Sequence, residues 1–241
     1  MAALRSAIGW TLLAPIYLTM GVALVLVVGL SGGRLRAPFV HWLMPHFAHV
    51  GLWLFGVEVE MTGLEHVAIR RPRILVVNHA STLDLFLFSA VNPPAPCPIG
   101  KASIRWMFPL NLAFWGAGTV FLDRGNKERA VVSLRRAGAR IRSEARTAMI
   151  SPEGTRSLDG ELQPFKRGAF HLSQQAQAEI VPVVIHGAWA LCPPGRAVIR
   201  PGRVRVEVKP PLPPSTDPAA DALALHARYV AWLRPETSGG R

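Results

Sequence analysis

From Arg73 to the C-terminus, short apolar runs alternate with amphipathic stretches, and this alternation restricts the fold more than any other feature of the sequence. Short apolar runs are typical of buried strands, whereas apolar residues that recur every three or four positions are typical of helices. Strands that alternate with helices build a mostly parallel sheet, because each helix provides the crossover connection. The sequence therefore predicts an α/β domain with a mostly parallel central sheet flanked by helices.

The predicted elements follow this pattern along the chain. Strands are expected at residues 74–77, 96–101, 119–122, 148–150, 180–186 and 204–208. Helices are expected at 82–91, 104–114, 126–145, 168–178 and 217–233. Asn126 is a candidate cap for the third of these helices, because a short polar side chain can accept a hydrogen bond from the first helical N–H groups.

The first 57 residues differ in composition from the rest, because they contain no acidic side chain and only three basic ones, Arg5, Arg34 and Arg36. The 28 residues between Arg5 and Arg34 carry no charge. About 20 apolar residues suffice to cross a bilayer, whereas the apolar part of a cleaved signal peptide is about 7–15 residues long. This stretch therefore predicts a membrane anchor, and its length alone leaves open whether it spans the bilayer or only enters it.

A second uncharged stretch, residues 37–57, contains Pro45, His41, His46 and His49 among several aromatic residues. This composition is typical of an interfacial or re-entrant helix, and it favours interface residues over metal ligands for the histidines. We therefore divide the chain into a membrane-associated helical segment, 1–57, and an α/β domain, 58–241. Basic residues flank the anchor mainly on its C-terminal side, which favours a domain on the cytoplasmic face of the inner or plasma membrane.

The chain is strongly basic, with a formal net charge of +12 over 241 residues. The part after residue 57 holds 24 basic and 15 acidic side chains, so the predicted domain itself has a surplus of +9. Such a surface favours nucleic acid, anionic lipid headgroups or phosphorylated substrates. The two cysteines, Cys97 and Cys192, lie far apart without a C-x-x-C spacing, so we expect no disulfide framework, no metal site and a reducing compartment.

Polar and charged residues follow three of the predicted strands at the point where each strand ends, and ligands of open α/β sheets bind outside the carboxyl ends of the strands. Taken alone, each of these residues has an ordinary structural role as a turn, a cap or a solvated charge. Together they offer an imidazole with a carboxylate to orient it, cations for a phosphate and a carboxylate for a hydroxyl. The residues are His79 and Asp84, then Arg124, then Glu153, Gly154, Thr155 and Arg156, with Lys101 at the end of the strand 96–101.

Four ordered blocks resemble those of the glycerolipid acyltransferases, and within that group the 1-acyl-sn-glycerol-3-phosphate (lysophosphatidate) acyltransferases. A lone His-x4-Asp is a weak signal, but the ordered set with Glu-Gly-Thr-Arg intact is specific. One departure is Ser151, which stands where the family often has a phenylalanine. The blocks are Asn78-His79 with Asp84, Gly118 to Arg124, Pro152 to Ser157, and Val181-Pro182-Val183-Val184.

The resemblance implies a direct acyl transfer. His79 would remove the proton from the free hydroxyl of a lysophospholipid, and Asp84 would orient the imidazole. The donor would be an acyl-CoA or an acyl-carrier protein, with no cofactor. Arg124, Arg156 and Lys101 would hold the acceptor phosphate, and Glu153 the glycerol. We therefore expect a membrane-associated enzyme of phospholipid biosynthesis that converts lysophosphatidate to phosphatidic acid.

Other functions fit the sequence less well. The chain has no G-x-S-x-G, and Gly100-Lys101 is followed by alanine rather than the Ser or Thr of a P-loop. A nucleic-acid binder would interleave aromatic and basic residues, but the basic stretch 126–145 contains no aromatic residue. Two alternatives remain: an acyltransferase for another lyso-lipid, such as lyso-ornithine lipid, and a non-catalytic basic protein of the membrane surface.

Overall fold

The computed structural model describes all residues except 109, 124, 126 and 235–241, and only the backbone of 110, 127 and 129. The strands are β1 (Val57–Thr62), β2 (Arg73–Val77), β3 (Pro96–Lys101), β4 (Val120–Leu122), β5 (Thr147–Ile150), β6 (Glu179–His186) and β7 (Gly202–Val208). The helices are α1 (Ala2–Leu30), α2 (Arg36–Phe55), α3 (Asp84–Val91), α4 (Leu110–Gly116), α5 (Lys127–Ser143), α6 (Gly168–Ala176), α7 (Ala188–Leu191) and α8 (Pro218–Leu233). Two 3₁₀ turns lie at Leu64–His66 and Ala102–Trp106.

The strands form one seven-stranded sheet in the order β1-β7-β6-β2-β5-β3-β4. β2, β3, β4, β5 and β6 run parallel to one another, β7 is antiparallel to β6, and β1 pairs in parallel with β7. The predicted mostly parallel sheet is therefore confirmed. Its strand order places β2 at the centre, so the residues after Val77 emerge at the middle of the carboxyl edge.

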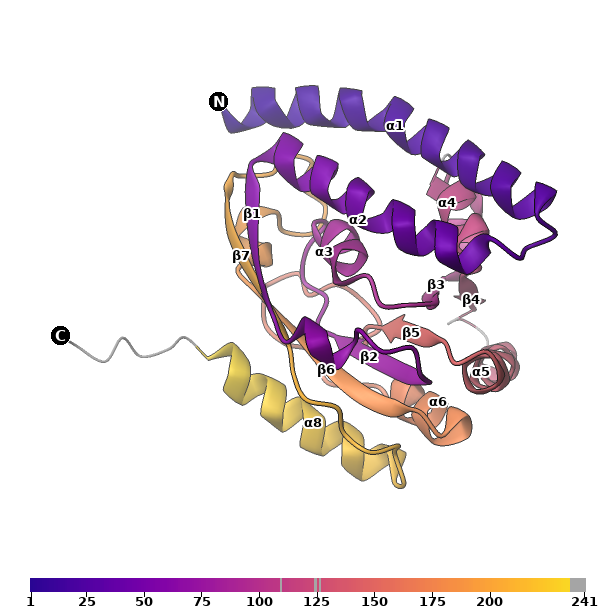
Figure 1. The fold of residues 1–241 in the computed structure, drawn as a ribbon. Coiled ribbons are helices and arrows are strands. Elements are labelled where there is room, and N and C mark those ends of the chain that lie inside the picture. The colour runs from indigo at the N-terminus through magenta and orange to yellow at the C-terminus, as the bar shows by residue number, and fades with distance from the viewer. Residues whose placement is uncertain (109, 124, 126, 235–241) are drawn as a thin grey trace.

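β2 is buried on both of its faces, as expected for a central strand in a parallel sheet. Leu75 and Val77 belong to a core that includes residues of α1, α2 and α3, whereas Ile74 and Val76 belong to a second core that includes residues of α5, α6 and α8. Figure 1 shows the resulting layers, with α1, α2 and α3 over one face of the sheet and α6 and α8 under the other. The two cores hold β2 from both sides, so they hold the start of the His79 turn in a defined place.

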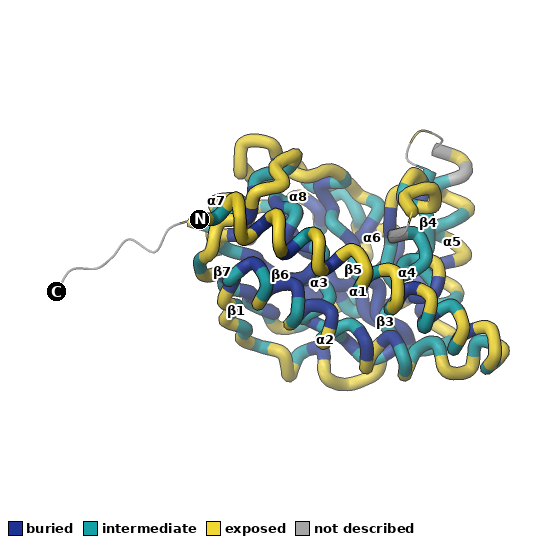
Figure 2. The backbone as a smooth tube through the Cα atoms, turned by 90° about the horizontal axis from the view of Figure 1, so that it is seen from above, coloured by how far each residue is buried: buried dark blue, intermediate teal, exposed yellow. Residues whose placement is uncertain are grey.

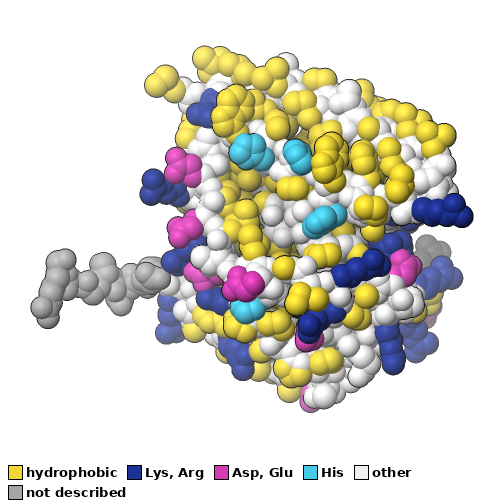
Figure 3. Space-filling view, viewed as in Figure 1, with side chains coloured by type: hydrophobic (Ala, Val, Ile, Leu, Met, Phe, Trp, Pro, Cys, Tyr) yellow, Lys and Arg dark blue, Asp and Glu magenta, His cyan; other side chains and the backbone are white. Residues whose placement is uncertain are grey.

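The helical hairpin of α1 and α2 lies along the domain rather than away from it. One stripe of α1 is buried, including Leu13 and Leu24, and its outward faces remain open to solvent (Figure 2). Its exposed large apolar residues are Leu4, Ile8, Leu12, Leu18, Val22, Leu26 and Leu30. Figure 3 shows apolar side chains over the half of the molecule formed by this hairpin, with Lys and Arg gathered mainly around the other half. Among the described helices α1 alone is long and apolar enough to cross a bilayer, which is consistent with membrane association.

One predicted helix differs from the structure, and an edge strand was missed. The helix expected at 104–114 is wrong, because a 3₁₀ turn at Ala102–Trp106 is followed by a separate helix, α4. The sequence has a proline at 109, and a proline lacks the N–H that a continuous helix needs. The edge strand β1 was not predicted, although Glu58 and Glu60 alternate there with apolar residues in the pattern of a half-buried strand.

Candidate active site

The Asn78 side chain joins the end of β2 to the neighbouring strand β6 by two hydrogen bonds. Its Nδ2 donates to the carbonyl of Ile185 at 2.9 Å, and its Oδ1 accepts the N–H of Ile185 at 2.8 Å. Asn78 is buried, so both bonds replace bonds to water. The side chain therefore continues the β2–β6 pairing beyond the last strand residue and sets the direction in which the chain enters the turn at His79.

His79 and Asp84 face each other across the turn between β2 and α3. The Nδ1 of His79 lies 2.7 Å from the Oδ2 of Asp84. The same oxygen accepts the N–H groups of Ala80 and Ser81, both at 2.9 Å. Because a carboxylate only accepts hydrogen bonds, Asp84 selects the His79 tautomer that carries its proton on Nδ1. The other ring nitrogen, Nε2, is then left as a base, and the side chain of His79 is 29% exposed whereas that of Asp84 is 1% exposed.

Ser81 ties this turn to the loop after α7. Its hydroxyl donates to the carbonyl of Cys192 at 2.7 Å and accepts the N–H of Leu83 at 3.0 Å. The Cys192 thiol is buried close to the turn, and burial raises its pKa, so it stays a neutral thiol at pH 7. A buried neutral thiol is a poor nucleophile.

Glu153 lies behind the His79 turn, on the loop that follows β5. Its Oε1 accepts the N–H of His79 at 2.7 Å, and its Oε2 accepts the N–H of Gln163 at 2.9 Å. Glu153 is 3% exposed, and burial raises the pKa of its carboxyl, while the two backbone N–H groups lower it. The N–H of Ser157 in turn donates to the carbonyl of His79 at 3.0 Å. This loop therefore contacts both sides of the His79 backbone.

Arg156 reaches the same turn from the same loop. Its guanidinium donates to the hydroxyl of Thr82 at 3.2 Å, and both Arg156 and Thr155 are exposed. Gly154 has a φ of +76°, a left-handed conformation that glycine adopts without strain. The sharp turn at Gly154 separates the buried carboxylate from the exposed guanidinium, so the Glu-Gly-Thr-Arg segment presents its cation at the surface, in contact with Thr82.

Lys101 is a predicted site residue that makes no hydrogen bond or ion pair with His79, Asp84, Glu153 or Arg156 among the described residues. Lys101 is exposed at the end of β3, which is separated from β2 by β5, so it lies about 10 Å away in the strand-pairing direction. Arg124 lies outside the described residues, as does the predicted cap Asn126. The phosphate-binding roles of Arg124 and Lys101 therefore stay predictions from the sequence.

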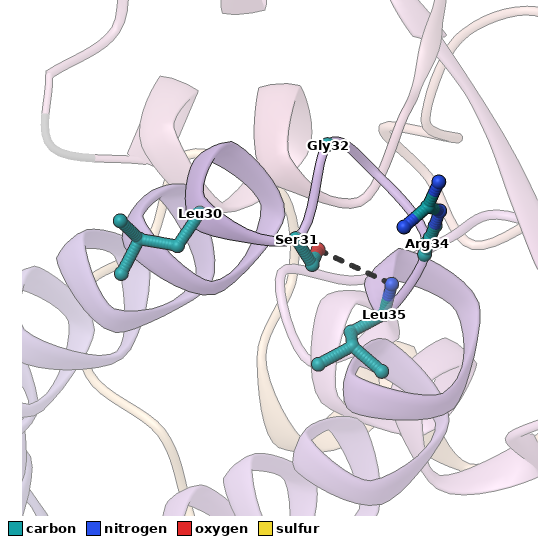
Figure 4. A pocket seen from close by; sticks show the side chains of 5 residues that line it. All are labelled: Leu30, Ser31, Gly32, Arg34 and Leu35. Carbon is teal, nitrogen blue, oxygen red and sulfur yellow. Dashed lines mark hydrogen bonds between the residues drawn. The ribbon is translucent and has the colours of Figure 1, made fainter.

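Two hollows of the surface lie apart from the motif residues. One is at the turn between α1 and α2 and is lined by Leu30, Ser31, Gly32, Arg34 and Leu35 (Figure 4). There the Ser31 hydroxyl accepts the N–H of Leu35 at 3.2 Å, which closes the turn. The other is lined by Arg135, Ala139, Arg142, Ser143 and Gln175. Neither lining contains His79, Asp84, Glu153 or Arg156.

The acyltransferase family model matches residues 58–186, which span the sheet from β1 to β6 and every motif residue described above. The chain belongs to the acyltransferase family. Its 1-acyl-sn-glycerol-3-phosphate acyltransferase relatives include the alpha enzyme of Bos taurus, 33% identical over 78% of this chain and 67% of its own. The Saccharomyces cerevisiae enzyme is 36% identical over 69% of this chain, which spans about half of that relative, 55%.

A solved structure shows the same fold. The 1-acyl-sn-glycerophosphate (LPA) acyltransferase PlsC of Thermotoga maritima superposes with a TM-score of 0.77 at 25% identity, covering 95% of this acyltransferase and 94% of that chain. The shared part includes α1 and α2 because nearly the whole chain is covered. This agreement confirms the predicted family and the α/β architecture with an apolar helical segment before it.

The sequence predicted the residue types of this site but not several contacts that build it. The spacing gave no sign of the Asn78–Ile185 bonds, the Ser81–Cys192 bond or the bond from Ser157 to His79. These contacts join segments that are up to 111 residues apart and involve backbone groups. A backbone donor has no sequence signature, so only the fold reveals these partners.

Proposed function

We propose that this acyltransferase transfers a fatty acyl group from an acyl thioester to the free hydroxyl of 1-acylglycerol-3-phosphate and forms phosphatidic acid. The observation that carries the proposal is the 2.7 Å contact between His79 Nδ1 and Asp84 Oδ2, at the carboxyl edge of the central strand. Relatives named for this activity, spanning most of this chain, support the choice of acceptor. An imidazole with a buried carboxylate partner is what a general base for an alcohol requires.

The reaction uses His79 as base and then as acid. Nε2 of His79 takes the proton of the sn-2 hydroxyl as its oxygen attacks the thioester carbonyl carbon. The tetrahedral intermediate collapses when the C–S bond breaks, and the thiolate that leaves takes the proton from His79. Asp84 stabilises the imidazolium between these steps. The acceptor is itself the nucleophile, so the acyl group passes directly from donor to acceptor.

Arg156 is proposed to hold the phosphate of the acceptor. Arg156 is exposed, and its guanidinium contacts Thr82. Thr82 lies three residues after His79 in the same turn. A guanidinium matches the geometry of a phosphate with two parallel N–H donors. Arg124 and Lys101 follow strands of the same edge and extend this cationic rim in the proposal. The donor is an acyl-CoA or an acyl-carrier protein, and no cofactor takes part.

The acceptor is tested with purified protein, a labelled acyl donor and a panel of lyso-lipids. The panel contains lysophosphatidate, monoacylglycerol, lysophosphatidylcholine and lyso-ornithine lipid. We expect kcat/KM for lysophosphatidate to exceed that for monoacylglycerol at least tenfold, because a charge-assisted hydrogen bond to phosphate is worth about 1.5–3 kcal/mol. Monoacylglycerol is the matched control, since it lacks only the phosphate. A preference for a neutral or zwitterionic acceptor would show that the phosphate roles are wrong.

The hairpin is proposed to lie in the membrane interface with the domain on the cytoplasmic face. Both ends of α1 are tied to the rest of the molecule. Ser6 and Trp10 bond to the carbonyls of Ile199 and Ala197, and Gly116 of α4 packs closely against Leu24. A helix held along its length cannot also stand across a bilayer, so its outward apolar face would enter one leaflet. The basic surface of the domain suits the anionic lipids of the cytoplasmic leaflet.

The double substitution Ile8→Asp with Leu26→Asp is expected to reduce binding to anionic phospholipid vesicles at least about tenfold. Each side chain is about half exposed, at 51% and 55%, so burying both in lipid contributes roughly 2 kcal/mol. The partition coefficient is measured by vesicle sedimentation. Leu223→Asp is the matched control, because Leu223 is 75% exposed on α8 under the opposite face of the sheet. Equal losses in both proteins, or terminal tags on opposite sides of a membrane, would contradict this arrangement.

A further inference from the structure

Three successive backbone N–H groups of the His79 turn donate hydrogen bonds to two carboxylates. The N–H of His79 donates to Glu153, and the N–H groups of Ala80 and Ser81 donate to Asp84. The two carboxylates come from opposite sides of the turn, Asp84 from the helix that follows it and Glu153 from a loop 74 residues away. A turn with all three donors bound in this way has little freedom to change its backbone conformation.

Both oxygens of the Glu153 carboxylate already accept a backbone N–H, and the carboxylate is almost completely buried. Oε1 is bound at 2.7 Å by the N–H of His79 and Oε2 at 2.9 Å by the N–H of Gln163. The residue is 3% exposed, whereas Arg156 of the same segment is exposed. Because Glu153 is 3% exposed, a substrate hydroxyl has little access to the remaining lone pairs of its carboxylate.

The chemistry of the acceptor also argues against a hydrogen bond between Glu153 and a substrate hydroxyl. In 1-acylglycerol-3-phosphate the sn-1 oxygen is esterified and the sn-3 oxygen carries the phosphate. The sn-2 hydroxyl is the only free one, and its proton goes to His79. No second hydroxyl exists for Glu153 to bind, so the glycerol-binding role that the sequence predicts for it has no partner group in this substrate.

We infer that Glu153 is a positioning residue that holds the backbone of His79, and not a ligand of the glycerol. The inference rests on the proposed lysophosphatidate reaction. Glu153 and the Ser157 N–H, which donates to the His79 carbonyl, clamp the peptide groups on both sides of the His79 Cα. The ring is held by Asp84 and the backbone by Glu153, so the position of Nε2 is set at two points. An amide in place of the carboxylate would turn an NH₂ toward one of the two N–H donors.

The inference is tested by steady-state kinetics of Glu153→Gln with lysophosphatidate as the varied substrate. We expect kcat to fall about 10–100-fold and KM for the acceptor to change less than twofold, because a displaced base slows the chemical step without removing a binding contact. Glu161→Gln is the matched control, since Glu161 is an exposed carboxylate of the same loop. A raised KM with an unchanged kcat would show that Glu153 binds the acceptor, and would overturn the inference.

A second measurement uses the wild-type protein, so it does not depend on whether the variant folds. Hydrogen exchange of the His79 amide is followed with and without saturating lysophosphatidate. We expect slow exchange in both states, because the bond to Glu153 stays intact. Faster exchange with acceptor bound would show that Glu153 releases the backbone to bind substrate. A wild-type protein that does not acylate lysophosphatidate would instead contradict the proposed function, while the exchange result would still report on the clamp.

Discussion

Replacing His79 by alanine is expected to reduce the rate of acyl transfer to lysophosphatidate about 10²–10⁴-fold, the usual contribution of a positioned general base. The physical reason is that Nε2 is the ring nitrogen left available once Asp84 holds Nδ1 at 2.7 Å. Without it, the lipid hydroxyl has to attack the thioester while still protonated or lose its proton to water. The loss corresponds to about 3–5 kcal/mol of activation free energy.

The His79→Ala protein should remain folded. Asp84 keeps the N–H groups of Ala80 and Ser81 as partners, and the removed ring is 29% exposed. The melting temperature and vesicle binding should therefore stay close to the wild-type values. His171→Ala is the matched control, because His171 is exposed on α6. Substantial transfer by the folded His79→Ala protein would exclude His79 as the base.

Replacing Asp84 by asparagine is expected to lower kcat about 10²–10⁴-fold while leaving KM for the acceptor nearly unchanged. The asparagine oxygen can still accept the backbone N–H groups at 80 and 81, so the turn keeps its shape. The negative charge is lost, and the imidazolium that forms during proton transfer is no longer stabilised in a site where Asp84 is 1% exposed. Steady-state kinetics with the acceptor as the varied substrate measure this effect.

The Asp84→Asn protein should also be less stable by roughly 1.5–3 kcal/mol, because charge-assisted hydrogen bonds at a buried carboxylate become neutral ones. Urea denaturation measures that change. Glu58→Gln is the control for removal of a carboxylate, since Glu58 lies exposed on the edge strand β1. An Asp84→Asn enzyme with wild-type kcat would mean that the carboxylate only shapes the turn and does not assist the imidazole.

The central strand and the dyad could be predicted because their signals are local. Residues 74–77 are a continuous apolar run, and β2 occupies Arg73–Val77. The turn that follows brings His79 and Asp84 together, as the strand-to-helix reading of the sequence requires. The edge strand β1 was not predicted, because its alternation of apolar residues with two glutamates is short and no second local signal accompanies it.

The function of Glu153 could not be derived from its neighbours in the sequence. A carboxylate before Gly-Thr-Arg in a polar loop is typical of a substrate ligand. The resemblance to the acyltransferases therefore predicted that Glu153 binds the glycerol. In the structure its partners are N–H groups of His79 and Gln163, which carry no sequence signal because every residue except proline has one. The structure therefore reveals hydrogen bonds between side chains and distant backbone groups that the motif does not predict.

The most direct test of the account is a single-turnover measurement with enzyme in excess over a labelled acyl thioester, for wild type and His79→Ala at saturating lysophosphatidate. This isolates the chemical step from binding and product release. We expect direct appearance of phosphatidic acid, no label on the protein at any time, and a rate for His79→Ala about 10²–10⁴-fold lower. Label bound to the wild-type protein before product forms, or equal single-turnover rates for the two proteins, would contradict it.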